Sequence, residues 1–160
     1  MKKTRPFVIL VLGFWLAAVL QQATVDRLQI GGARPDLLLI LAFSTAVMFA
    51  PRYAALFGFV AGLLQGAITG ADLAHYTISY TIVAYLAGFL SWLELDIRAW
   101  YVALVVIGGT IIVGLIMMIP APPVQFWPYL GDTILSAIYN GVLAIPLYVL
   151  IKRLLHPKEN

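Results

Sequence analysis

Apolar residues fill six stretches of the chain, and proline, glycine and charged positions separate one stretch from the next. Each stretch is close to the roughly 20 residues that a helix needs to cross a bilayer. We therefore predict spans over Pro6–Ala23, Pro35–Ala50, Tyr53–Gly70, Leu73–Leu93, Trp100–Ile119 and Tyr129–Leu155. Pro146 is expected to kink the last span. The pattern predicts an all-α polytopic membrane helical bundle of about six transmembrane helices, with residues 1–160 forming a single domain.

The composition agrees with this class of protein. Hydrophobic residues make up 62% of the chain and charged residues 11%, and the mean hydropathy is +0.97. So few charges cannot cover the surface of a soluble protein of 160 residues. The chain contains no cysteine, which excludes internal disulfides, thiolate metal sites and a cysteine nucleophile.

A row of glycines occupies every fourth position of the third predicted span, at Gly58, Gly62, Gly66 and Gly70. On a helix these positions stay near one face. Interior glycines weaken a helix in water, whereas in lipid small residues at this spacing allow another helix to approach closely. The row predicts a helix-packing face. The sequence leaves open whether a helix of the same chain or of a partner packs there.

Few polar side chains interrupt the predicted spans. Gln65 and Asn140 each place an amide in hydrocarbon, where it needs a hydrogen-bond partner. A partner within this chain and one on another subunit remain equally open. Asp36 and Asp72 stand at the starts of the second and fourth spans, where a carboxylate can cap a helix N-terminus. We interpret both acids as structural caps.

Basic residues predict the orientation, because cytoplasmic loops of membrane proteins carry an excess of lysine and arginine. Six spans put both termini on one side. If that side is the cytoplasm, only Arg27 and Arg34 lie outside. The other basic residues then share the cytoplasmic side: Lys2, Lys3, Arg5, Arg52, Arg98, Lys152, Arg153 and Lys158. We predict a multi-pass membrane protein with both termini cytoplasmic.

The basic clusters have a simple explanation in this orientation. They can contact anionic membrane lipids, so the net charge of +3 requires no nucleic-acid partner. The basic start followed by an apolar run also has the pattern of a secretory signal. We expect it to be retained as the first span, because its removal would leave five spans.

Candidate chemistry is sparse. The sequence has no HExxH, GxSxG or glycine-lysine phosphate motif. His75 and His156 are expected near opposite membrane faces, and the acids gather at span ends rather than at mid-membrane depth. An intramembrane enzyme or channel is therefore disfavoured, and we predict no catalytic, cofactor-binding or metal-binding residue.

The connection before the last span is uncharged and contains four prolines between positions 120 and 128. It also carries Phe126 and Trp127. Such a stretch is typical of a stiff apolar loop at the membrane interface, or of a docking surface for a neighbouring protein. We take both aromatic residues as candidate partner contacts.

Three blocks of sequence resemble the MreD family of rod-shape-determining membrane proteins. The first is Arg34-Pro35-Asp36 with the leucine-rich run after it and the turn Ala50-Pro51-Arg52. The second is the glycine-rich segment from Gly58 to Gln65, with Thr69-Gly70 and the segment Ile82–Leu86. The third is Asn140-Gly141-Val142-Leu143, with Pro146 and Lys152-Arg153. One departure is Gln65, where many family members carry aspartate.

The resemblance implies a non-enzymatic scaffold of the bacterial cell-elongation machinery, the elongasome, located in the bacterial inner (cytoplasmic) membrane. Such a subunit works with an MreC-like single-span protein, MreB filaments and the synthases of peptidoglycan. The resemblance also implies a fold similar to the S-components of energy-coupling-factor vitamin transporters, so a substrate-binding S-component is the alternative. S-components usually carry alanines four residues apart in the first span. Here Ala17 and Ala18 are followed by Gln21 and Gln22, which weighs against that alternative.

Overall fold

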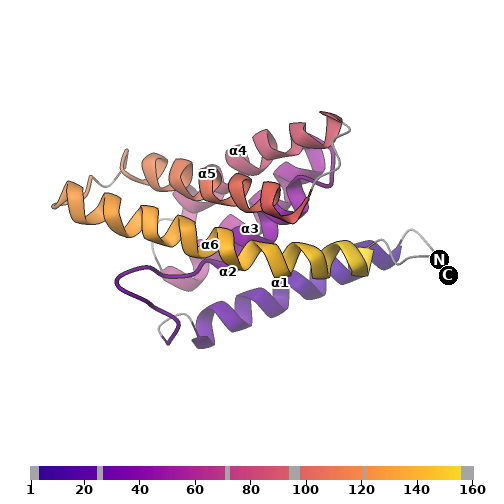
Figure 1. Cartoon of the computed structure of the whole chain (residues 1–160), viewed down its shortest axis with the longest axis horizontal. Coiled ribbons are helices and arrows are strands. Elements are labelled where there is room, and N and C mark those ends of the chain that lie inside the picture. Colours follow the sequence, from indigo (N-terminus) through magenta and orange to yellow (C-terminus); the bar gives the residue numbers. More distant parts are fainter. Residues whose placement is uncertain (1–3, 25–26, 71–72, 94–97, 121, 156–160) are drawn as a thin grey trace.

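The computed structural model describes residues 4–24, 27–70, 73–93, 98–120 and 122–155. Within these ranges the chain forms helices and no β-strand (Figure 1). The elements are α1 (Thr4–Thr24), α2 (Leu37–Ala46), α3 (Pro51–Thr69), α4 (Leu73–Gly88), the 3₁₀ helix η1 (Phe89–Leu93), α5 (Ala99–Met117) and α6 (Phe126–Leu155). The structure confirms the predicted all-α bundle.

The helices run back and forth along one axis, with the start of α1 and the end of α6 at the same end of the molecule (Figure 1). We call this end the termini end and the opposite one the Asp36 end, because α2 starts after its N-cap Asp36 and runs toward the termini end. Four segments are long and apolar enough to cross a membrane, namely α3, α4 with η1, α5 and α6. The apolar parts of α1 and α2 are shorter.

The second predicted span is wrong in its length. Helix α2 has 10 residues, about 15 Å at 1.5 Å per residue, and every side chain from Leu38 to Ala46 is buried. A helix that is apolar on all sides belongs in a core, and α2 packs against α1, α3, α4, α5 and α6. It ends in a tight turn that leads to Pro51, the first residue of α3. Proline is well suited to that position.

The most extensive helix contact joins α3 to α4, and the glycine row forms it. A Cβ on Gly58 would overlap the Tyr80 carbonyl oxygen, and one on Gly62 would lie 2.5 Å from the Tyr76 carbonyl oxygen. Gly66 meets the backbone at the start of α4 in the same way. This face is therefore covered by a helix of the same chain.

Gly70 differs from the other three glycines of the row. It ends α3 in the left-handed conformation, with φ of 62°, and a Cβ there would have no atom within 4 Å. Glycine adopts this conformation without a steric penalty. The structure thus corrects the expectation that Gly70 extends the packing face, because the residue terminates the helix.

Two further boundaries differ from the prediction. The last helix begins at Phe126 rather than at Tyr129, so Phe126 and Trp127 belong to its first turn and not to a loop. Pro128 does not prevent this, since the N–H groups of the first turn have no intrahelical acceptor. The fourth predicted span changes from α-helix to a 3₁₀ helix at Phe89. At the other end of the chain, α6 continues through Pro146 to Leu155.

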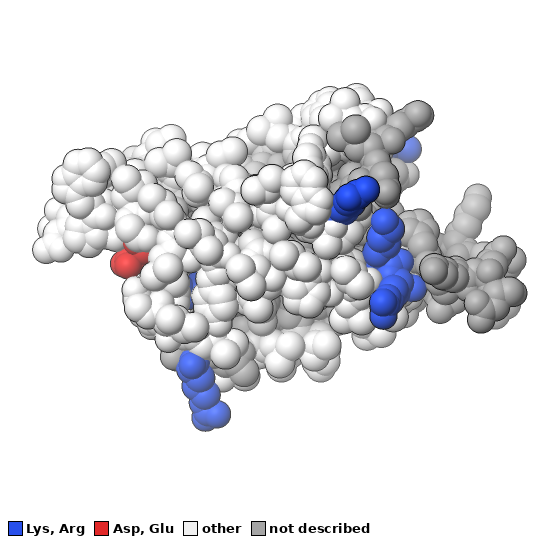
Figure 2. Space-filling model, viewed as in Figure 1, with Lys and Arg blue, Asp and Glu red and all other residues white. Residues whose placement is uncertain are grey.

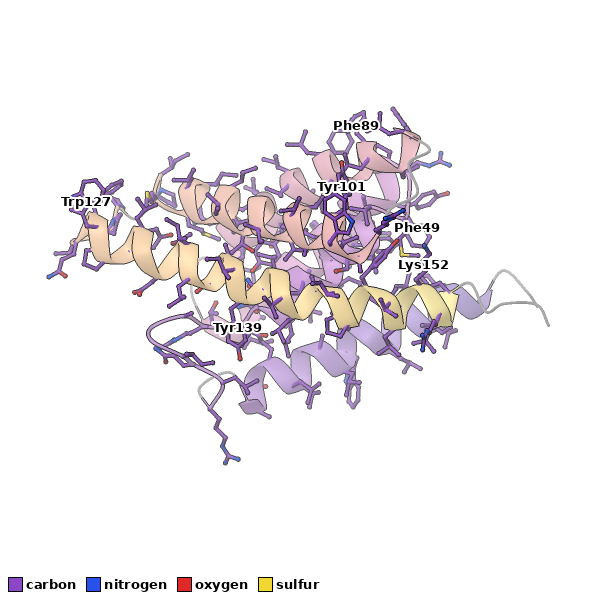
Figure 3. All side chains as sticks on the ribbon, in the orientation of Figure 1. Phe49, Phe89, Tyr101, Trp127, Tyr139 and Lys152 are labelled. Carbon is purple, nitrogen blue, oxygen red and sulfur yellow. The ribbon has the colours of Figure 1, made fainter. Side chains whose placement is uncertain are left out.

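The alternating helix order brings Arg52, Arg98, Lys152 and Arg153 to the termini end. Figure 2 shows basic side chains gathered at that end of the molecule. Figure 3 shows Lys152 there and Trp127 at the opposite end of α6. Which end faces the cytoplasm stays a prediction from the positive-inside rule.

Candidate functional site: a polar cluster at the Asp36 end

A tight turn directs the chain back into the bundle before α2. Ile30 and Ala33 exchange two backbone hydrogen bonds, of 3.1 and 2.9 Å. Between them Gly31 and Gly32 have φ of 56° and 92°, a conformation that only glycine adopts readily at two successive positions. The turn leads through Arg34 and Pro35 to Asp36, where side chains of α1, α4 and α6 meet the start of α2.

Asp36 is the N-cap of α2. Its Oδ1 accepts a hydrogen bond of 2.8 Å from the Leu39 backbone N–H. Its Oδ2 accepts a hydrogen bond from the hydroxyl of Tyr80 on α4. Both carboxylate oxygens are therefore engaged by the protein itself.

Asn140 connects α6 to the same point. Its Oδ1 accepts the Asp36 backbone N–H at 2.9 Å, and its Nδ2 donates to the Thr110 hydroxyl on α5 at 3.3 Å. The Asn140 side chain is only 1% exposed. The Asn140 amide thus has both of its partners within this chain, at the start of α2 and on α5.

Gln21 supplies the corresponding connection from α1. Its Nε2 donates to the Pro35 carbonyl oxygen at 3.1 Å, and its Oε1 accepts the Leu37 backbone N–H at 2.8 Å. The Gln21 side chain is 3% exposed. One amide therefore satisfies two backbone groups at the entrance to α2. Nearby, the Arg34 backbone N–H donates to the Ser136 hydroxyl at 3.2 Å.

We name Gln21, Asp36, Tyr80, Thr110 and Asn140 the polar cluster. The first backbone N–H groups of a helix have no intrahelical acceptor, and those of α2 lie inside an apolar bundle where water is scarce. Side chains from α1 and α6, together with the Asp36 carboxylate, supply the missing acceptors. The cluster ties α1, α4, α5 and α6 to the start of α2.

Two cavities flank Asp36. One has a volume of about 460 Å³ and lies between α1, α3 and α4, with Gln21, Gln22, Arg34, Gln65 and Tyr76 among its lining residues. The other, of about 320 Å³, lies between α4, α5 and α6. Arg34, Asp36 and Tyr76 line both cavities.

Gln65 is a buried polar residue that lies outside the cluster. Its side chain is 7% exposed, and its Oε1 has no hydrogen-bond partner in the part of the chain that the structure describes. It lies on α3, beside the packed glycine row, and borders the larger cavity. A buried acceptor in this position is open to a donor from outside the chain.

Comparison with known proteins supplies the family. The family model described as MreD, rod shape-determining protein MreD, matches residues 1–156. The chain belongs to the MreD family. It is a rod-shape-determining membrane protein of the multi-pass type. No curated protein and no solved structure matches the chain, so the expected likeness to S-components stays a prediction.

The other candidate residues of this MreD-family protein lie apart from the polar cluster. Trp127 is 77% exposed and Phe126 is 48% exposed. Their rings meet edge to face, with centroids 5.3 Å apart. They form the first turn of α6 at the Asp36 end (Figure 3). Asp72, the second expected cap, lies outside the described residues.

Sequence reasoning singled out Asp36, Gln65 and Asn140 but missed Gln21, Tyr80 and Thr110. Gln21 stands at the end of an apolar segment, where a polar side chain ordinarily marks the membrane interface. Tyrosine and threonine are common in membrane helices and give no positional signal alone. One signal could have indicated such residues: the N–H groups at the start of a helix within the membrane have no acceptor in that helix, so other side chains must supply one.

Proposed function

We propose that this MreD-family protein is a non-enzymatic scaffold of the bacterial cell-elongation machinery. It binds an MreC-like single-span membrane protein and thereby supports peptidoglycan synthesis and cell shape. It does so from the inner membrane, with both termini in the cytoplasm, and in company with MreB filaments and cell-wall synthases. The observation that carries this proposal is the family match over residues 1–156.

The structure narrows the choice of partner surface. Because α4 covers Gly58, Gly62 and Gly66, the glycine row is not free to receive a partner helix. The aromatic tip, which we define as Val124, Phe126 and Trp127, is exposed and uncharged. We assign the MreC-like contact to this tip.

The length of α6 supports this assignment. Its 30 residues span about 45 Å, which exceeds the roughly 30 Å hydrocarbon core of a bilayer. With its basic end held at one membrane face, the start of α6 reaches the opposite face or stands beyond it. Exposed tryptophan in such a place is a frequent source of binding energy in protein interfaces.

The test is purification of the tagged protein from native membranes in mild detergent, with identification of the proteins that come with it. The wild-type protein is expected to recover the MreC-like partner. Trp127→Ala is expected to reduce that recovery at least about fivefold, since loss of a central interface tryptophan commonly costs more than 1 kcal/mol. Trp100→Ala is the matched control, because Trp100 is 58% exposed at the termini end.

Two results would contradict the proposal in different ways. Failure of the wild-type protein to recover any MreC-like partner or cell-wall synthase would contradict the scaffold function. Equal recovery by the wild type and by Trp127→Ala would leave the scaffold in place but move the contact away from the aromatic tip. Cell shape in a strain that carries each variant gives a second readout.

A substrate-binding transporter subunit is the second candidate, and one observation favours it. The polar cavity of about 460 Å³ lies within the roughly 300–1,000 Å³ range of small-molecule sites. The same purification distinguishes the two functions. Recovery of a stoichiometric vitamin-like molecule together with an ATPase module would contradict the scaffold function and support the transporter subunit.

A further inference from the structure

Helices α1 and α3 run in the same direction, and two cavities follow each other along the cleft between them. The first cavity, of about 420 Å³, lies toward the termini end and is almost wholly apolar. Apolar side chains of both helices line it, among them Phe7, Phe14, Trp15, Leu56, Val60 and Leu64. The second is the polar cavity that borders Gln65.

The two cavities are close neighbours along both helices. On α3 the adjacent residues Leu64 and Gln65 line one cavity each. On α1 the step from Trp15 to Gln22 is about 10 Å at 1.5 Å per residue. The cleft thus has an apolar stretch followed by a polar end, which matches the apolar and polar parts of an amphiphile.

The polar end has a defined set of open hydrogen-bonding groups. Asp36 and Gln21 already bond within the chain, and each Asp36 carboxylate oxygen accepts one hydrogen bond. The Gln65 Oε1 is buried and without a partner in the described part, and it needs a donor. Arg34 uses its Nε–H for the Gln29 Oε1 at 3.3 Å, which leaves the N–H groups of its two Nη atoms for an anion.

We propose that this cleft binds a membrane lipid with an anionic phosphate headgroup that carries a hydroxyl. The phosphate pairs with the Arg34 guanidinium, the hydroxyl donates to the Gln65 Oε1, and an acyl chain occupies the apolar cavity. Phosphatidylglycerol has this chemistry. A hydroxyl suffices as the donor, because the Gln65 Oε1 is a neutral amide oxygen.

Lipid in this position would also explain how α1 stays in place. Helix α1 packs against its neighbours less extensively than any of the other α-helices. An acyl chain between α1 and α3 would supply the apolar contacts that protein side chains do not. The lipid site is independent of the proposed partner contact at the aromatic tip.

The test uses the purified full chain after lipid removal, titrated with phosphatidylglycerol or with phosphatidylcholine of the same acyl chains and followed by native mass spectrometry. Phosphatidylglycerol is expected to bind about tenfold more tightly, because phosphatidylcholine has neither the net charge nor a donor. Equal binding of the two lipids would overturn the proposal.

Glycerol phosphate, the free headgroup, is expected to bind at least about a hundredfold more weakly than phosphatidylglycerol. Binding as tight as that of the lipid would overturn the part played by the acyl chain.

Substitutions at the two proposed headgroup contacts test which residues bind the lipid. Arg34→Gln is expected to weaken phosphatidylglycerol binding about tenfold, and Gln65→Met, which keeps the side-chain length, to weaken it about threefold. Arg27→Gln is the control, because Arg27 is an exposed arginine of the same connection that lines neither cavity. Unchanged binding by Arg34→Gln, or an equal loss in Arg27→Gln, would overturn the site.

Thermal unfolding without lipid identifies any variant that fails to fold. Val60→Phe tests the apolar part of the site separately, because the larger ring fills the apolar cavity and leaves the residues that contact the headgroup unchanged. This variant is expected to lower lipid binding.

Discussion

Asn140 on α6 accepts the backbone N–H of Asp36 at 2.9 Å, across 104 positions of the chain. The bond satisfies one of the N–H groups at the start of α2 that the helix cannot satisfy itself. Because the Asn140 amide also reaches Thr110, one side chain holds three helices in register.

Asn140→Leu should destabilise the bundle. The Asp36 N–H would lose its acceptor in an apolar surrounding, at a cost of about 1–3 kcal/mol. The measurement is the free energy of unfolding in detergent. Ile138→Ala serves as control, because Ile138 is half exposed on the same helix. A smaller loss for Asn140→Leu than for Ile138→Ala would argue against a structural role of the amide.

Tyr80→Phe should cost less, because it removes only the hydroxyl that donates to Asp36. The ring stays and keeps its contact with Phe43, at a centroid distance of 6.2 Å. Hydrogen bonds between membrane helices are worth about 0.6 kcal/mol on average and up to about 1.7 kcal/mol, and we expect a loss in this range. Tyr85→Phe, at a 43% exposed tyrosine of the same helix, should leave the unfolding free energy unchanged.

Gln21→Leu should loosen α1. The Pro35 carbonyl and the Leu37 N–H would both lose their partner, and α1 has few other contacts. We expect faster backbone hydrogen exchange in α1 and at the start of α2, with little change in α5. The neighbouring Gln22 is exposed, so Gln22→Leu is the matched control. Identical exchange in the two variants would show that the Gln21 bonds do not hold the helix.

Gly62→Leu should separate α3 from α4. Even a Cβ would lie 2.5 Å from the Tyr76 carbonyl oxygen, and the larger side chain cannot be accommodated without moving a backbone. Overpacking of this kind costs about 1–3 kcal/mol or more. The matched control is Gly108→Ala on α5, where a Cβ would meet no atom within 4 Å. If Gly62→Leu and Gly108→Ala unfold at the same temperature, the close contact is not needed for stability.

Several features of the site could be predicted from local sequence. Asp36 directly after proline at the start of an apolar run indicates a helix cap, and a cap needs only the three residues that follow it. Gln65 and Asn140 stood out because an amide is costly in hydrocarbon. The partners of these residues were beyond prediction, since Asp36 and Tyr80 are 44 positions apart and no local pattern fixes such a distance.

The two boundaries that were wrong have different causes. The second span was expected to have bilayer length because hydropathy does not distinguish a helix that faces lipid from one buried among other helices. Phe126 and Trp127 were placed in a loop because Pro128 follows them, although proline is tolerated in a first turn. The surrounding helices decided the first outcome, whereas the tolerance of proline in a first turn explains the second.

The sequence by itself determined the class of this protein, its helical content and its family. These follow from hydrophobic runs of bilayer length and from local motifs, which need no knowledge of contacts. The tertiary structure decided that Gly58, Gly62 and Gly66 face α4 and that α2 lies inside the bundle. It also decided that Asn140 pairs with Asp36 while the Gln65 Oε1 borders a cavity. In lipid, apolar surface alone gives little preference for one helix arrangement over another. Close packing and the pairing of each buried polar group select the arrangement, and both depend on residues far apart in the chain.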